Sequence, residues 1–467
     1  MSERIASEIQ FDEARAGSVP PGLRPAICRS TSQLCAERCG GMLRAIVLTG
    51  SLARDEATFV REGERWKLLG DAEFLLVFDQ DAVLPSSSII DRLEREIERH
   101  LRQQGLCGHV ELSPVHTRYL RTMPSEIFAY ELRTCGQVVW GERQILSLIP
   151  AFSPSGIPLE DGWRMLCNRV VECIEVIDLV VEKPVDPAPD GRYRMIKLYL
   201  DMATSFLLFQ GVYAPTYRER AERLSTLVAE HEMRTPDYSH CRESSTPRTP
   251  DRSHFRESGN PAEAHRNCPF PLEDFARRVA YCTQFKLQAG DGVNAQPPEG
   301  PNGVRPAGEE ALPGIFSCTE LVTYARKLWR WELEQLTGEQ DKLSDHELMR
   351  RWMRLQPIGK RLRGWASALR RCGWHRSWRQ WPHWIRLGWR ASPRYWVYAA
   401  ASEFFLRLPV ILKGDGPAPE ADSQLRSIRS WLPVAGDSFG TGGDLGWREV
   451  AADIAWNYRA FLKTTRS

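Results

Sequence analysis

The chain has 467 residues and a formal net charge of +2, and 42% of its residues are hydrophobic while 26% are charged. This length and balance are typical of a soluble globular protein with two or three domains, and they exclude collagen-like and wholly disordered chains. No apolar run reaches the roughly 18 residues of a membrane-spanning helix. The twelve cysteines form no Cys-x-x-Cys pair, and Met1–Gly17 lacks the apolar core of a secretory signal. We therefore expect a cytoplasmic protein with reduced thiols and no transmembrane segment.

The first 150 residues predict a mixed α/β arrangement. Leu43–Thr49 is an apolar, β-rich run, and Glu73–Phe78 and Val110–Val115 are two more. Between the last two, Ile89–Gln104 places apolar residues at helical spacing, with charged residues between them. The polar stretch Val60–Leu68 predicts a hairpin. This alternation of strands and helix predicts a sheet that is covered on at least one face.

Helical patterns dominate the rest of the chain. We predict helices at Leu159–Val181, Tyr193–Phe209, Tyr213–Glu230, Phe270–Leu287, Thr319–Leu336, Ser344–Leu355 and Trp396–Leu412. Ser344, followed by Glu347 three residues later, forms a capping box that predicts where one of these helices begins. We therefore expect a helical domain over residues 151–235 and a helical, Trp/Arg-rich C-terminal domain over residues 314–467.

The stretch between these two helical domains, residues 236–313, has a different composition. Residues 237–247 and 251–261 repeat the pattern Asp-x-Ser-His-x-Arg-Glu-Ser-x-x-Pro, and proline and glycine are frequent after residue 288. Two copies of a short motif cannot build a solenoid, which needs about three repeats. We therefore predict that residues 236–313 are a disordered, repeat-containing insertion and linker with one helix near residues 270–287.

The candidate functional residues lie where the first predicted strand ends and where the second begins. Leu43–Thr49 runs into Gly50 and Ser51, where glycine permits the close approach of an anion and the amides of a helix start favour phosphate. Asp71 and Glu73 are two residues apart on a strand, so they project from the same face. Such carboxylates repel each other unless a cation lies between them, and Mg²⁺ or Mn²⁺ prefers oxygen ligands of this kind. The pattern predicts metal-assisted phosphoryl or nucleotidyl transfer.

Gly50-Ser51 and Asp71-Ala72-Glu73 together resemble the motif of the nucleotidyltransferase superfamily, which shares the polymerase β-like catalytic core. The nearest resemblance is to its small bacterial and kanamycin-type members, in which helices follow the catalytic domain. It implies an α+β fold, with a nucleotidyltransferase-type mixed sheet over residues 1–150 followed by mainly α-helical domains. The segment Tyr130–Gly141 resembles the strand pair that ends this catalytic domain. One departure is the spacer between the two motifs, since its 19 residues, Leu52–Gly70, are more than the family usually has.

The resemblance also implies roles for individual residues. Gly50 and Ser51 would hold the terminal phosphates of an NTP, with ATP as the expected donor, while Asp71 and Glu73 would bind one or two Mg²⁺ or Mn²⁺ ions. Glu111 is the best match for the third carboxylate of the family, which completes the metal site or takes a proton from the acceptor hydroxyl. The acceptor itself is not identified by the sequence.

Some of these positions have a second interpretation. Arg54 would reach a phosphate or pair with Glu56 or Asp55. Asp79 and Asp81 compete with Glu111 as the third acidic position.

Two other classes of function stay open. One is a catalytically weak nucleotidyltransferase fold that serves as a regulatory or antitoxin-like binding protein. The other is an adaptor for an anionic partner, since Leu348–Ser402 holds 13 Lys/Arg residues, no Asp or Glu, and eight of the 16 tryptophans. A basic, aromatic surface favours nucleic acid, an anionic glycan or lipid. Alternatively, these tryptophans pack a helical core while the arginines face solvent.

Overall fold

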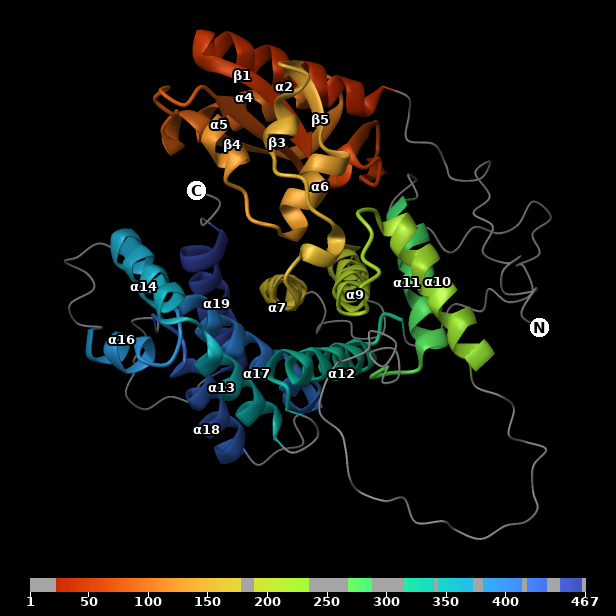
Figure 1. Cartoon of the computed structure of the whole chain (residues 1–467), viewed down its shortest axis with the longest axis vertical. Coiled ribbons are helices and arrows are strands. Elements are labelled where there is room, and N and C mark those ends of the chain that lie inside the picture. The colour runs from red at the N-terminus through yellow and green to blue at the C-terminus, as the bar shows by residue number, and fades with distance from the viewer. Residues whose placement is uncertain are drawn as a thin grey trace.

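The computed structural model describes residues 22–177, 189–234, 268–287, 315–339, 343–372, 381–413, 418–434 and 446–463. The repeat-containing part of the predicted insertion, residues 236–267, and most of the proline- and glycine-rich linker after it lie outside these ranges. A mixed sheet with flanking helices forms the N-terminal part of the molecule, and helices form the rest (Figure 1). The α+β class is therefore confirmed. No described helix combines the length and the apolar character that crossing a membrane requires.

Five strands form the sheet: β1 (Leu43–Thr49), β2 (Thr58–Glu62), β3 (Arg65–Phe78), β4 (Leu106–His116) and β5 (Gln137–Gly141). The long strand β3 organises the others. Its first part pairs antiparallel with β2, its second part pairs antiparallel with β1, and β4 runs parallel to it. β5 completes the sheet by pairing antiparallel with β1. The sheet thus contains both antiparallel and parallel strand pairs.

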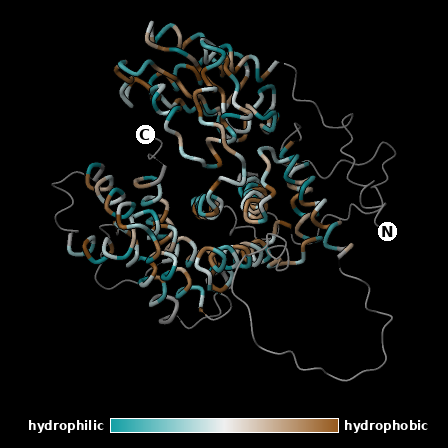
Figure 2. Tube along the Cα trace, in the orientation of Figure 1, coloured by the Kyte–Doolittle hydropathy of each residue, from teal (hydrophilic) through white to brown (hydrophobic). Residues whose placement is uncertain are grey.

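Helices cover both faces of the sheet. The helices α2 (Leu23–Cys39) and α4 (Ser87–Gln103) pack on one face. The short helices α5 (Thr117–Arg121) and α6 (Ile127–Cys135) pack on the other. In Figure 2 the strands at the centre of this region are largely hydrophobic, because both faces are covered.

The predicted strands and helix of this region are confirmed, with β3 extending back to Arg65. The predicted hairpin is confirmed as the β2–β3 turn at Gly63, whose φ is +62°. The expected strand pair near residue 130 is wrong, because Tyr130–Leu132 lies in α6 and only β5 follows as a strand. A helix forms there because Ala129 and Leu132, three residues apart, both pack against the sheet.

The described helices of the second part are α7 (Leu159–Glu175), α9 (Pro189–Phe209), α10 (Tyr217–Arg234), α11 (Leu272–Leu287), α12 (Cys318–Thr337), α13 (Asp345–Leu355), α14 (Ile358–Cys372), α16 (Trp381–Gly388), α17 (Pro393–Lys413), α18 (Ala418–Arg429) and α19 (Trp447–Tyr458). One hydrophobic core joins them, from Trp163 in α7 to Phe461 after α19. The capping box of Ser344 and Glu347 is confirmed at the start of α13.

Candidate active site

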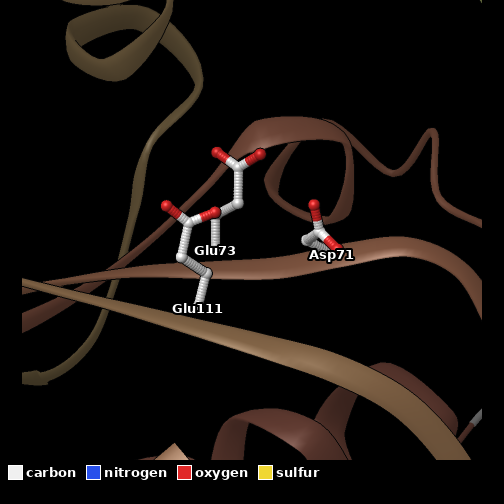
Figure 3. Close-up of side chains that lie close together, drawn as sticks. All are labelled: Asp71, Glu73 and Glu111. Carbon is white, nitrogen blue, oxygen red and sulfur yellow. The ribbon is translucent and has the colours of Figure 1, made fainter. Parts of the chain in front are cut away.

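Three carboxylates from two neighbouring strands meet at the surface of the sheet. Asp71 and Glu73 share one face of β3, while Ala72 between them is buried on the other face. In the parallel register of β3 and β4, Glu73 lies opposite Glu111. One oxygen from each of the three carboxylates lies within 4.8 Å of one from each of the others. Figure 3 shows Glu73 and Glu111 reaching toward one another, with Asp71 beside them.

This cluster brings together the three acidic residues that the sequence singled out. Asp71 is exposed, and Glu73 and Glu111 are half-buried. Two charges at such a separation repel by roughly 1 kcal/mol in water and by several times more at lower dielectric constant. Three carboxylates in this arrangement fit a hard divalent cation such as Mg²⁺, which takes carboxylate oxygens as ligands.

The end of β1 lies against this cluster. Thr49 pairs with Glu73 across the β1–β3 register, so Gly50 begins the next turn directly beside the carboxylate. A Cβ atom built on Gly50 would lie 3.1 Å from Cδ of Glu73, and the φ of Gly50 is +69°. Glycine is therefore required here for both its conformation and its size. Ser51 follows in α3 (Gly50–Ala53), which is a single turn, so phosphate binding here would depend on local amides and the hydroxyl rather than on a helix dipole.

Arg54 has a different environment from the residues of this cluster. Its guanidinium donates to Glu56 at 3.1 Å and to Glu131 at 2.6 Å, and it lies over the ring of Tyr217. Arg220 forms a second ion pair with Glu131. The pairing with Glu56 was one of the two alternatives for Arg54, whereas Glu131, in α6, was not predicted.

The arginines change the ionisation of their buried partner. Burial by itself would raise the pKa of Glu131, but the Arg54 and Arg220 guanidiniums and a hydrogen bond from Tyr213 lower it below its ordinary value. Glu56 extends this network, since it also accepts hydrogen bonds from the backbone amide of Tyr217 at 2.6 Å. The network joins the sheet region to α10.

A second buried network supports the start of the acidic segment. The Tyr193 hydroxyl of α9 donates to the carbonyl oxygen of Leu69, and a Cβ atom on Gly70 would lie 3.2 Å from that hydroxyl. Lys286 of α11 donates to Tyr193 at 2.9 Å and to Thr58 at 3.1 Å. Burial lowers the pKa of Lys286 to about 7. The helices therefore hold the backbone at Leu69, two residues before Asp71.

No sequence pattern marks this support, because Tyr193 and Lys286 are ordinary members of helical patterns far from β3 in the chain. The competing acidic positions lie elsewhere. Asp79 follows the far end of β3, where it pairs with Arg44 at 3.3 Å, and Asp81 is exposed in the next turn.

The tryptophans of Leu348–Ser402 divide between the core and the surface. Trp352, Trp384 and Trp396 are buried in the helical core, whereas Trp389 is 87% exposed. Trp374 and Trp378 lie outside the described residues. Packing in the helical core thus explains some of these tryptophans. An anionic partner for Leu348–Ser402 stays a prediction.

Comparisons with protein-family models, with curated proteins and with solved structures gave no match for this chain.

Proposed function

We propose that this protein is a Mg²⁺-dependent nucleotidyltransferase that moves a nucleoside monophosphate from an NTP to a hydroxyl acceptor and releases pyrophosphate. The observation that carries the proposal is the convergence of Asp71, Glu73 and Glu111 beside Gly50. Glycine turns and carboxylate clusters are each common in proteins. A glycine turn packed on a carboxylate cluster is suited to holding phosphates next to a cation. ATP as donor and a cytoplasmic location are parts of the same proposal.

Each residue of the proposed site would have a distinct role. The backbone amides at Gly50 and Ser51 and the Ser51 hydroxyl donate hydrogen bonds to the β- and γ-phosphate oxygens. Asp71 and Glu73 would supply the carboxylate oxygens that hold the cation, and Glu111 would either complete this set or take the proton of the acceptor hydroxyl. A bound divalent ion supplies Lewis-acid chemistry and neutralises phosphate charge.

Transfer forms a bond between the acceptor oxygen and the α-phosphorus, and it breaks the bond from the α-phosphorus to the oxygen that bridges to the β-phosphate. The electron pair of the broken bond leaves with pyrophosphate. The acceptor hydroxyl loses its proton, and Glu111 is the residue proposed to take it when it lies within hydrogen-bond reach of that hydroxyl.

Release of pyrophosphate from each of the four NTPs tests this proposal while the acceptor is unknown, because water can take the place of the acceptor. We expect Mg²⁺-dependent release from at least one NTP. Asp71→Asn with Glu73→Gln should lower the rate by about 10³-fold or more, which corresponds to roughly 4 kcal/mol of activation free energy. Asp81→Asn, an exposed carboxylate in the turn after β3, is the matched control and should leave the rate unchanged.

The outcomes separate the hypotheses. Release that continues in the double variant contradicts the assigned site. Tight NTP binding without release in the wild type contradicts turnover and favours a regulatory binding protein.

A further inference from the structure

Exposed apolar side chains gather on two neighbouring helices of the C-terminal part, α14 and α16 (Figure 1). Ile358 and Ile385 are each 69% exposed, and Trp389 is 87% exposed. Single exposed apolar residues are normal on a protein surface, but clusters of them mark interaction sites. Of the thirteen exposed large hydrophobic side chains among the described residues, five lie here and make up what we call the apolar surface: Leu355, Ile358, Leu362, Ile385 and Trp389.

Hydrogen bonds join the helices that carry this surface. The guanidinium of Arg361 donates to the carbonyl oxygen of Arg354 at 2.6 Å and to that of Trp389 at 3.0 Å. The end of α16 therefore lies beside the start of α14. The Nε1 atom of Trp365, also on α14, donates to the carbonyl oxygen of Ala391 at 2.8 Å. The exposed residues of α14 and α16 thus belong to one packed unit.

Packing in the core does not explain the exposed apolar residues of α16. Trp384 and Leu387 are buried and fill the side of the helix that faces the core. Trp384 is also anchored, because its Nε1 atom donates to the carbonyl oxygen of Pro433 at 2.6 Å. Ile385 and Trp389 are four residues apart, so they share a different side of the helix, and that side faces solvent.

Positive charge surrounds the apolar surface. Leu348–Ser402 holds 13 Lys/Arg residues and no Asp or Glu. Arg386 and Arg390 are exposed, lie next to Ile385 and Trp389 in the chain, and form no ion pair with a described residue. Glu160 of α7 pairs with Lys360 at 3.0 Å and so offsets one of the positive charges. The charge around the apolar surface therefore favours an anionic partner.

We propose that the apolar surface docks on an anionic lipid membrane, with its apolar side chains in the interface and the neighbouring arginines against the phosphate headgroups. Exposed Leu, Ile and Trp beside Lys and Arg are typical of helices that lie in the membrane interface without crossing it. Single-stranded nucleic acid favours aromatic rings that stack on bases, whereas four of the five side chains of the apolar surface are aliphatic. The proposal does not depend on the proposed transfer reaction.

Flotation of the full chain with lipid vesicles tests this proposal. We expect binding to vesicles of equal parts phosphatidylglycerol and phosphatidylcholine, weaker binding at high salt, and no binding to vesicles of phosphatidylcholine alone. Ile385→Ser with Trp389→Ser should weaken the binding by about tenfold or more. Val83→Ser with Met233→Ser removes two exposed apolar side chains outside the apolar surface, and this matched control should leave binding unchanged.

A second pair of variants tests the contribution of charge. Arg386→Gln with Arg390→Gln should weaken binding to the anionic vesicles by about tenfold and reduce its salt dependence. Arg95→Gln with Arg99→Gln removes two exposed arginines at the same spacing on α4, and it should have no effect.

Several outcomes would overturn the proposal. One is absence of binding to the anionic vesicles by the folded wild type, and another is equal binding by the Ile385→Ser, Trp389→Ser variant. Tight binding of a single-stranded oligonucleotide that this variant loses would assign the surface to nucleic acid. Self-association of the wild type that this variant abolishes, measured by sedimentation velocity, would assign it to a second copy of the chain. Because both residues are exposed, thermal unfolding of the variant should match that of the wild type.

Discussion

Two groups of carboxylates in the sheet region differ in how their charge is accommodated. Glu56 and Glu131 lie buried against Arg54 and Arg220, so each negative charge has a cationic partner in the interior. Asp71, Glu73 and Glu111 face one another at the surface instead. A buried ion pair of the first kind holds elements together, whereas a cluster of like charges costs free energy until a cation binds. We therefore assign the first group a structural role and propose a functional role for the second.

Glu332 has a third kind of environment, in the helical part of the molecule. Glu332 of α12 is fully buried in the helical core, where Ser205 is the polar side chain that affects its carboxyl group. Burial raises the pKa of Glu332 to about 8, so this carboxyl holds a proton at neutral pH. Arginine thus neutralises the first group and a proton neutralises Glu332, and we propose that a metal ion does so for Asp71, Glu73 and Glu111.

The largest effect on stability should come from breaking the arginine-paired group. We expect Glu131→Gln to lower the free energy of unfolding by about 3–5 kcal/mol, because it leaves Arg54 and Arg220 buried with less compensation. Urea denaturation measures this change. Arg38→Gln removes the exposed partner of Glu96, so it should lower the free energy of unfolding far less, and it serves as the control. Equal losses of unfolding free energy in the two variants would contradict the claim that the buried ion pairs stabilise the fold more than the exposed pair.

The protonated carboxyl predicts a specific pH dependence. Because the native state holds the proton of Glu332 up to a pH of about 8, its contribution is present at low pH and is lost as the pH rises through 8. Between pH 6 and pH 8 this loss should amount to about 2 kcal/mol. Glu332→Gln should therefore unfold at higher urea than the wild type at pH 9, with the difference shrinking toward pH 6. A difference that does not depend on pH would show that Glu332 is not protonated in the folded state.

A smaller effect on stability tests the packing of the Gly50 turn. Gly50→Ala should cost about 1 kcal/mol of stability through its positive φ alone. Its effect on NTP binding should be larger, since the added Cβ presses on the Glu73 carboxylate. Gly63→Ala places the same strain in the exposed β2–β3 turn, where a Cβ meets nothing within 4 Å, and should leave NTP binding unchanged.

Much of the sheet region could be predicted because its signals are local. The β1 boundaries Leu43–Thr49 follow directly from a short apolar run that ends at Gly50. The i, i+2 spacing of Asp71 and Glu73 places both on one face of β3, and only the register that brings Glu111 opposite Glu73 had to come from the structure. The capping box at Ser344 is likewise a signal contained within four residues.

What could not be predicted depends on contacts across the sequence. The pairing of Arg54 with Glu131 joins the end of α3 to α6. The family resemblance had placed Glu131 in a strand pair, whereas it lies in α6. The Tyr193 hydroxyl of α9 likewise reaches the carbonyl oxygen of Leu69 in β3, 124 residues away in the chain. Such contacts depend on tertiary packing, so the spacing of residues within one segment cannot predict them.

A thermal-shift measurement with each of the four NTPs, in Mg²⁺ and in EDTA, tests the central claim most directly. The account predicts a rise in the unfolding temperature that requires Mg²⁺, since a ligand at 100 times its dissociation constant adds about 2.7 kcal/mol to stability. Asp71→Asn with Glu73→Gln should abolish the rise, and Asp81→Asn should retain it. Absence of a shift with every NTP in the folded wild type, or a shift that persists in the double variant, would contradict the assignment of Asp71, Glu73 and Glu111 as a metal–nucleotide site.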